Sequence, residues 1–180
     1  MARPTLDPLL LLHQMQQAGR QAAPGLPEQV QSAPLWSGLG FRLAGSQFVT
    51  PLSNVTEVLP SPPVTPVPGT KRWVKGVANV RGNLLTIVDL PEYFGKEAVG
   101  NDEAARLLIL NIPGLNAAVV VNEVYGLRHF DEEQEKQDIS SLNDPMFAHL
   151  SGAFLRDNVL WGIFDMHSLA ESPEFKHVAI

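Results

Sequence analysis

Side chains that transfer protons, attack substrates or bind metal ions are spread widely in this sequence. It has 180 residues, with no cysteine and five histidines. The absence of cysteine excludes disulfides, thiol nucleophiles, cysteine-ligated zinc and iron–sulfur clusters. No two histidines have the spacing by which one helix presents two metal ligands. The histidines are His13, His129, His149, His167 and His177. We therefore expect neither a metal site nor a cofactor.

Short motifs for other reactions are incomplete. Gly38-Leu39-Gly40 lacks the third glycine of a dinucleotide-binding turn and opens a predicted strand instead of following one. The acidic stretch 131–137 lacks the glycine and terminal glutamate of a calcium loop, so it is interpreted as a solvated loop or helix. Asp89 and Asp165 each precede a predicted helical turn, and helix capping explains both better than catalysis. The sequence therefore favours a protein that is not an enzyme.

Charge and hydropathy narrow the class of partner. Thirteen basic and nineteen acidic residues give a net charge of −6, which disfavours a nucleic-acid backbone as a partner. The apolar run 9–12 is shorter than the about 7–15 residues of a signal peptide. No stretch approaches the roughly 20 apolar residues of a membrane span. We expect a cytoplasmic protein that reaches a membrane only through partners.

The predicted secondary structure, which must position any functional side chains, differs between two parts of the chain. Residues 1–36 predict a short amphipathic helix and a linker rich in glutamine, alanine and proline. That helix either caps the domain or docks on a partner, and disorder is the third interpretation. After it, short apolar runs between turns are typical of an all-β domain. Four hairpins are predicted, with turns at 44–47, 81–83, 113–115 and 156–158. Residues 60–68 contain five prolines and are not expected to form a central strand.

An internal repeat relates the second hairpin to the fourth. The stretch 76–89 recurs as 152–165 when two compensating one-residue shifts are placed around the arginine that each contains. Upstream, 55–58 resembles 121–124. These matches predict two similar small β modules, and chance similarity of hairpins is the alternative.

Apolar residues exceed what two small barrels can cover on their inward faces. These residues are Val55, Val58, Val77, Val80, Leu85 and Ile87. Because exposed apolar surface marks partner sites, we expect some of them to form a patch or groove. Arg81, at a predicted turn, either braces a carboxylate within the protein or anchors an interface. Binding through surface shape is therefore the predicted activity.

The central hairpin carries a resemblance to a known family. Residues 76–82, Gly-Val-Ala-Asn-Val-Arg-Gly, and 84–90, Leu-Leu-Thr-Ile-Val-Asp-Leu, resemble the Gly-Val-x-Asn-Leu-Arg-Gly…Pro-Ile-Val-Asp-Leu signature of CheW-like domains. Residues 55–58 match the family's Val-x-Glu-Ile/Val stretch. Thr86 stands where the family usually has proline, and Asn122 where it usually has aspartate. The resemblance extends over about residues 38–172.

This resemblance implies a mainly β fold of two five-stranded β-barrel subdomains related by a pseudo-two-fold axis, with short helices. The implied domains are an N-terminal extension at 1–36, a CheW-like domain of two intertwined barrels at 37–176, and a tail at 177–180.

The resemblance also implies a non-catalytic chemotaxis adaptor that couples membrane chemoreceptors to a CheA-like histidine kinase. The N-terminal part is similar to CheW-like proteins of type IV pilus chemosensory systems, which implies control of twitching motility. Carried over by position, the implied receptor-binding residues are Val55, Glu57 and Val58. The implied receptor- and kinase-coupling residues are Gly76, Asn79, Arg81 and Gly82, and the implied kinase-binding residue is Val124. A small-ligand-binding β-barrel and a structural pilus subunit without kinase contact are the alternatives.

Overall fold

The computed structural model describes residues 35–100, 102–131, 135–136 and 144–179. These residues belong to one unit that spans 34–180. Of the helix and linker predicted for residues 1–36, residues 1–34 lie outside the described residues, as does most of the acidic stretch 131–137.

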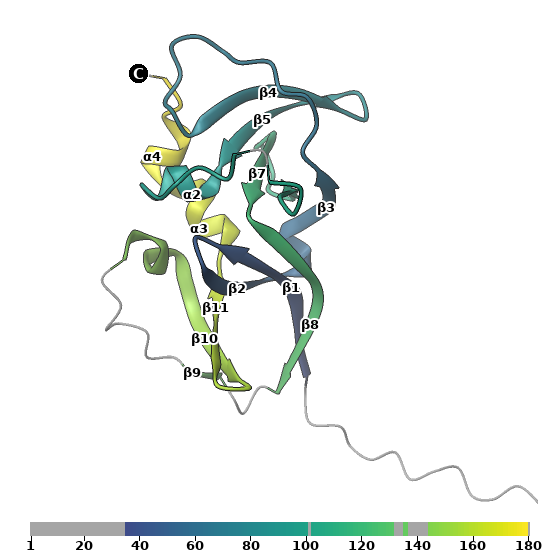
Figure 1. The fold of residues 1–180 in the computed structure, drawn as a ribbon, viewed down its shortest axis with the longest axis vertical. Helices are drawn as coiled ribbons and strands as arrows, with labels where there is room; N and C mark the ends of the chain where they lie inside the picture. Colours follow the sequence, from purple (N-terminus) through teal and green to yellow (C-terminus); the bar gives the residue numbers. More distant parts are fainter. Residues whose placement is uncertain (1–34, 101, 132–134, 137–143, 180) are drawn as a thin grey trace, which may run out of the picture. The chain divides into compact units, whose positions relative to one another are not determined.

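The described residues form a mainly β structure with a few short helices (Figure 1). The strands are β1 (Leu35–Leu43), β2 (Ser46–Pro51), β3 (Val55–Pro60), β4 (Val74–Val80), β5 (Asn83–Asp89), β6 (Arg106–Leu110), β7 (Ala117–Val121), β8 (Glu123–Asp131), β9 (Glu135–Lys136), β10 (Leu150–Arg156) and β11 (Val159–Phe164). The helices are α2 (Leu90–Tyr93), α3 (Met166–Glu171) and α4 (Pro173–Lys176), with 3-10 turns η1 (Leu52–Asn54) and η3 (Pro145–His149).

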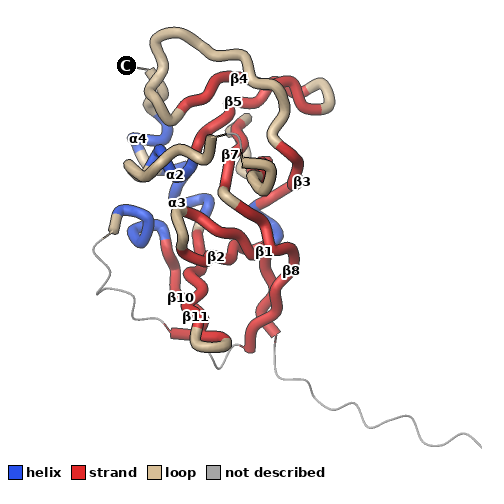
Figure 2. The backbone as a smooth tube through the Cα atoms, viewed as in Figure 1, coloured by secondary structure: helices blue, strands red, loops and turns tan. Residues whose placement is uncertain are grey.

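Two sheets contain these strands. One, termed the β1 sheet, has the order β8-β1-β2-β11-β10-β9, and the other, termed the β3 sheet, has the order β3-β6-β7-β5-β4. The β3 sheet lies in the upper part of Figure 1 and the β1 sheet in the lower part. The four predicted hairpins are confirmed as β1–β2, β4–β5, β6–β7 and β10–β11. Figure 2 shows the proline-rich segment as a long loop between β3 and β4, as predicted.

The two sheets repeat one topology. In each, two hairpins meet through a parallel pair, β2 with β11 and β7 with β5, and one more strand pairs antiparallel at the edge, β8 or β3. Each sheet nevertheless combines strands from both halves of the sequence, because β1–β2 pairs with β8 and β11 whereas β6–β7 pairs with β3 and β5. The repeat predicted from sequence is therefore confirmed as two equivalent sheets that exchange hairpins.

The registers correct the sequence alignment of this repeat. The β4–β5 and β10–β11 hairpins superpose at a constant spacing of 76 positions, with the same bulge before Gly76 and Gly152. No compensating shifts are needed, so the equivalent of Arg81 is Asp157 and not Arg156. Both turns place the first residue at φ 51°, as a two-residue type I′ hairpin requires.

The match predicted between 55–58 and 121–124 is wrong. The bulge in β3 falls at Thr56 and the bulge in β8 at Tyr125, so these strands correspond at a spacing of 69 positions. The equivalent of Glu57 is consequently Gly126 instead of Glu123.

Each sheet curls so that a side chain from the hairpin on its far side contacts the edge strand β3 or β8. In the β3 sheet, Arg81 of the β4–β5 turn forms an ion pair with Glu57 of β3. In the β1 sheet, Arg156 of β10 donates a hydrogen bond to the His129 carbonyl of β8, with an N–O distance of 2.9 Å. Within the described residues, no backbone ladder joins β3 to β4 or β8 to β10. The two predicted barrels are therefore found as two curled sheets, one of which carries a sixth strand.

Three apolar clusters fill the described structure. One lies between the sheets and includes Phe41, Leu108 and Phe164, together with residues of all three helices. The others line the concave side of the β3 sheet, around Ile87, and of the β1 sheet, around Trp161. All five residues of β7 are buried because this strand is central and has a cluster on each face.

Both aspartates predicted to cap helices do so. The Asp89 carboxylate accepts hydrogen bonds from the Glu92 and Val99 main-chain N–H groups, each at 3.0 Å, and is 2% exposed. Asp165 accepts from the N–H groups of His167 and Ser168. With their oxygens occupied in this way, these carboxylates stabilise helix starts.

The chain segments at both ends of the domain are more ordered than the predicted boundaries imply. Leu35 and Trp36, assigned from sequence to the linker, pair with Asp131 and Phe130 as the first residues of β1. The predicted tail is also attached, because Lys71 donates its main-chain N–H to the Val178 carbonyl. The strand pairing with β8 and the contact of Val178 with the apolar cluster between the sheets explain both differences.

We expect the folded state to lose stability as the pH falls below neutral because of His149. Burial lowers the pKa of His149, and the nearby Asp165 carboxylate opposes this effect. Protons therefore bind the unfolded chain more readily, and stability declines from the ordinary histidine pKa of about 6.5 down to the lowered pKa of the folded state. Urea unfolding at pH 8 and pH 5.5 should show a smaller decline for His149→Gln than for the unsubstituted chain. His167→Gln, at an exposed position, is the control, and equal declines in all three proteins would contradict the prediction.

Candidate binding surface

The predicted coupling residues gather mainly at the turn between β4 and β5. Arg81 adopts φ 51° and Gly82 φ 87°, and the Gly82 main-chain N–H donates to the Asn79 side-chain oxygen at 2.9 Å. A left-handed conformation costs a residue with a side chain about 1–2 kcal/mol relative to glycine. The hydrogen bond from Asn79 fixes the turn in this conformation, and the Arg81 side chain projects from it.

An ion pair connects this turn to the predicted receptor-binding strand. The Arg81 Nη2 lies 2.5 Å from the Glu57 Oε1. The Arg81 side chain is 72% exposed, whereas that of Glu57 is 26% exposed. Of the two interpretations left open by the sequence, bracing of a carboxylate is confirmed. Because the guanidinium has five N–H donors and remains largely exposed, it can also contact a partner.

Both the backbone conformation at position 76 and its close contact with Thr65 require glycine. The φ of Gly76 is 137°, and a Cβ atom built on it would lie 2.1 Å from the Thr65 carbonyl oxygen. Thr65 and Val77 exchange two main-chain hydrogen bonds of 2.8 and 2.9 Å, which fasten the proline-rich loop to the outer edge of β4. Gly76 thus lies at the opposite end of β4 from Arg81 and permits this close approach of the loop.

The predicted site valines are half-buried. Val55 and Val58 of β3, and Val124 of β8, pack against the apolar cluster between the sheets. Val55, Glu57 and Val58 share one strand with the Arg81 contact, but Val124 belongs to the other sheet. Of the implied receptor residues, only Glu57 contacts the Arg81 turn, whereas Val55 and Val58, like the implied kinase residue Val124, face the cluster between the sheets.

The six apolar residues expected in excess are not the most exposed ones. Val80, Leu85 and Ile87 are buried, and Val55, Val58 and Val77 are half-buried. The concave side of the curled β3 sheet accommodates the first three.

Other apolar side chains are exposed, and sequence reasoning missed them. Leu84 is 64% exposed and lies directly after the Arg81 turn, and Leu127 on β8 is 50% exposed. Alternation along β5 was a signal for Leu84, because buried Leu85 and Ile87 leave Leu84 on the opposite face. Leu84 is thus an exposed apolar side chain on the same hairpin as Arg81, and apolar side chains together with arginine are typical of protein interfaces.

The two departures from the family pattern have local structural roles. Thr86 donates its main-chain N–H to the Asn116 carbonyl at 3.0 Å, a bond that proline cannot form. The Asn122 side-chain oxygen accepts from the Ala44 N–H at 2.8 Å and so connects the β1–β2 turn to the start of β8. Both residues fasten neighbouring strands together.

Metal-binding clusters and membrane-spanning helices are both absent from the described residues. Groups of three or more histidine, aspartate or glutamate side chains arranged to hold a metal ion were not found among these residues. Within the same part of the chain, none of the helices has the length and hydropathy needed to span a membrane.

Comparisons with known proteins agree on one family. The model of the CheW-like domain matches residues 37–174. Protein PilI of Pseudomonas aeruginosa is 39% identical over 173 residues, which cover 96% of this chain and 97% of that protein. Protein FrzA of Myxococcus xanthus is 31% identical over 59% of this chain and 66% of its own length. The crystal structure of the scaffolding protein TtCheW from Thermoanaerobacter tengcongensis superposes with a TM-score of 0.66 at 24% identity, and covers 77% of this chain and 94% of that one.

Proposed function

This chain belongs to the CheW-like domain family, whose members are non-catalytic scaffold adaptors, and we propose that it couples membrane chemoreceptors to a CheA-like histidine kinase. The observation that carries the proposal is the 39% identity to Protein PilI over nearly the whole of both chains. That similarity supports a role in a type IV pilus chemosensory system and hence in twitching motility. We place the protein in the cytoplasm, at receptor arrays that it reaches through its partners.

The proposed receptor surface is β3 together with the Arg81 turn. Val55, Glu57 and Val58 contact the receptor tip, and the segment from Gly76 to Gly82, which includes Asn79 and Arg81, transmits receptor binding to the kinase. The Glu57–Arg81 ion pair supplies a physical route. A receptor group that engages the Glu57 carboxylate competes with Arg81 for it, so the turn changes its contacts when the receptor binds. Such a scaffold changes kinase output only if it binds the receptor, the kinase or their active arrangement with different affinity.

The proposed kinase surface lies on the other sheet, around Val124. Separate surfaces for receptor and kinase let one chain bind both at once. Individual contacts of micromolar affinity, worth about −8 kcal/mol each, suffice because an array makes many of them simultaneously.

Isosteric substitutions should separate the two surfaces. We expect Val58→Thr to weaken binding of a receptor-tip fragment roughly tenfold, or about 1.4 kcal/mol, while binding of the kinase regulatory domain stays unchanged. Val124→Thr should do the reverse. Threonine keeps the shape of valine at these half-buried positions, whereas aspartate would bury a charge against the core. Surface-immobilised full-length chain titrated with each partner measures both affinities.

The matched control is a truncated chain that lacks residues 1–34. It begins at Leu35 because Leu35 and Trp36 belong to β1. Absence of kinase binding by the full chain would refute the adaptor proposal. Equal losses for both partners in both variants would refute the assignment of separate surfaces.

A further inference from the structure

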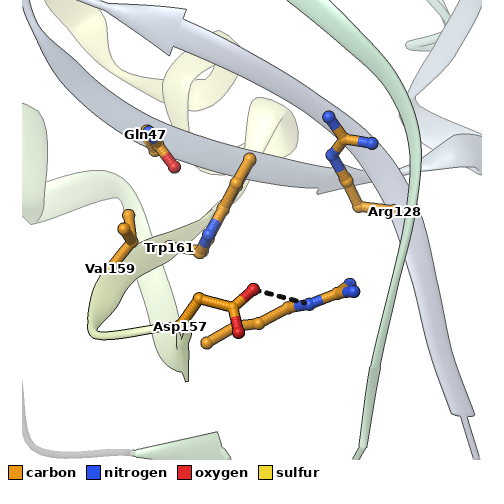
Figure 3. A pocket seen from close by; sticks show the side chains of 6 residues that line it. Gln47, Arg128, Asp157, Val159 and Trp161 are labelled. Carbon is orange, nitrogen blue, oxygen red and sulfur yellow. Dashed lines mark ion pairs between the residues drawn. The ribbon is translucent and has the colours of Figure 1, made fainter.

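A cationic pocket lies on the concave side of the β1 sheet, where the β10–β11 turn approaches β8 (Figure 3). Its volume is about 220 Å³. The lining residues are Gln47, Arg128, Arg156, Asp157, Val159 and Trp161. None of them belongs to the receptor or kinase surfaces proposed above. The pocket is smaller than the about 300–1,000 Å³ of sites for drug-sized ligands, and so suits a single side chain.

The equivalent place in the β3 sheet is filled with aliphatic side chains. The registers make Leu59 the counterpart of Arg128 and Val80 the counterpart of Arg156. Leu59 and Val80 both contribute to the apolar cluster of the β3 sheet. Two equivalent positions thus hold aliphatic side chains in the β3 sheet and arginines in the β1 sheet. The backbone fold therefore does not require arginine at either position.

Two aromatic rings contact Arg128, and Gly40 leaves room for its side chain. Its guanidinium carbon lies 5.8 Å from the centre of the Tyr125 ring and 5.9 Å from that of Trp161, within the range of cation–π attraction. A Cβ atom on Gly40 would lie 2.8 Å from the Arg128 Cγ and 3.1 Å from the Trp161 ring. The counterpart of Gly40 in the β3 sheet is Ile109, which packs into the apolar cluster there. Glycine at this position therefore makes room for Arg128 over Trp161.

Arg156 is positioned at the other side of the pocket. It donates to the His129 carbonyl, and its Nε lies 3.6 Å from the Asp157 carboxylate, the ion pair drawn in Figure 3. Two arginines and one aspartate give the lining a formal charge of +1. This charge matches a monoanionic carboxylate better than a phosphate dianion, and the planar guanidinium fork fits a carboxylate in geometry.

An apolar hollow of about 330 Å³ adjoins the pocket and shares Gln47 and Val159 with it. Its other apolar side chains come from Phe48, Phe147, Leu150 and Leu160. The Gln47 side-chain oxygen is buried and accepts no hydrogen bond from the described residues.

We infer that this pocket binds the carboxylate side chain of an acidic residue in a partner polypeptide, with an apolar neighbour of that residue in the adjoining hollow. The carboxylate accepts hydrogen bonds from Arg128 and Arg156 above the Trp161 ring. This inference does not rest on the coupling of receptor to kinase, because the pocket can be tested without either partner.

In the test, the full chain is titrated with the capped peptide acetyl-Leu-Glu-Leu-amide. Binding is monitored by NMR as the shift of the indole N–H resonance of Trp161. We expect a saturable shift, and binding at least tenfold weaker for the peptide with glutamine in place of glutamate. Arg128→Leu and Arg156→Val, the residues of the β3 sheet, should each weaken binding at least fivefold. Arg156→Lys should retain part of it, because the charge remains while the fork is lost.

Arg72→Ala, which removes an exposed arginine far along the chain from the pocket, is the control and should bind like the unsubstituted chain. Melting temperatures of all variants identify any that fail to fold, and Arg156→Lys keeps the test decisive if Arg156→Val is one of them. Equal binding of the glutamate and glutamine peptides would overturn the inference. So would sodium acetate shifting the Trp161 resonance with the affinity of the peptide, because the site would then accept any free carboxylate.

Discussion

Arg81→Ala is expected to lower receptor-dependent kinase activation at least tenfold in a reconstituted array while leaving the fold intact. The ion pair with Glu57 involves a side chain that is 72% exposed, and exposed pairs contribute only about 0–1 kcal/mol to stability. Alanine also keeps the left-handed backbone no worse than arginine does. Stability therefore changes little, and the loss falls on contacts that the guanidinium makes with partners. Phosphotransfer assays with the receptor and the kinase, beside a thermal melt, measure the two effects separately.

Asp157→Ala provides a matched control for this prediction. Asp157 occupies the equivalent position in the β10–β11 turn, with the same φ of 51° and an 87% exposed side chain. It should alter kinase activation much less than Arg81→Ala. A double-mutant cycle with Glu57→Ala then measures how far the ion pair itself carries the coupling. Normal kinase activation by Arg81→Ala would show that the turn does not transmit the receptor signal.

Gly76→Ala is expected to destabilise the fold by at least about 3 kcal/mol, a large fraction of the stability of a typical domain. Two costs combine. The φ of 137° lies in a region that residues with side chains rarely adopt, and the new methyl group would overlap the Thr65 carbonyl. Relief of that overlap requires the proline-rich loop to leave β4, which breaks both hydrogen bonds between Thr65 and Val77.

Gly82→Ala distinguishes the two costs. Its φ is 87°, but nothing lies within 4 Å of a Cβ atom built there, so only the conformational cost of about 1–2 kcal/mol applies. Denaturant unfolding of both variants should therefore show a clearly larger loss for Gly76→Ala. Similar losses would mean that the loop yields easily and that the Thr65 contact is not tight in solution.

Gly76 and Arg81 also show why one motif contains two kinds of residue. Both belong to the stretch that carries the family resemblance, yet Gly76 is required by a backbone contact whereas Arg81 is held in a conformation that arginine disfavours. Asp157 adopts the same φ as Arg81, so the backbone conformation alone does not distinguish the two turns, and the Arg81 side chain with its ion pair does.

The sequence by itself determined the local structure. Turn residues such as Arg81-Gly82 located the hairpins, because left-handed backbone conformations and strand alternation are encoded within a few residues. Asp89 and Asp165 were identified as helix caps for the same reason, since a cap and its N–H donors are neighbours in the chain. The family signature is equally local, and it led to the adaptor function.

Only the tertiary structure decided which hairpin joins which sheet. Main-chain hydrogen bonds pair any strand with any other, so the exchange of β1–β2 and β6–β7 left no local signal. The alignment of 55–58 failed for this reason, because its true register is set by a bulge against β6. The ion pair of Glu57 with Arg81, and the position of Arg128 and Arg156 in one pocket, likewise depend on the curl of each sheet, which brings together strands that are not neighbours in it.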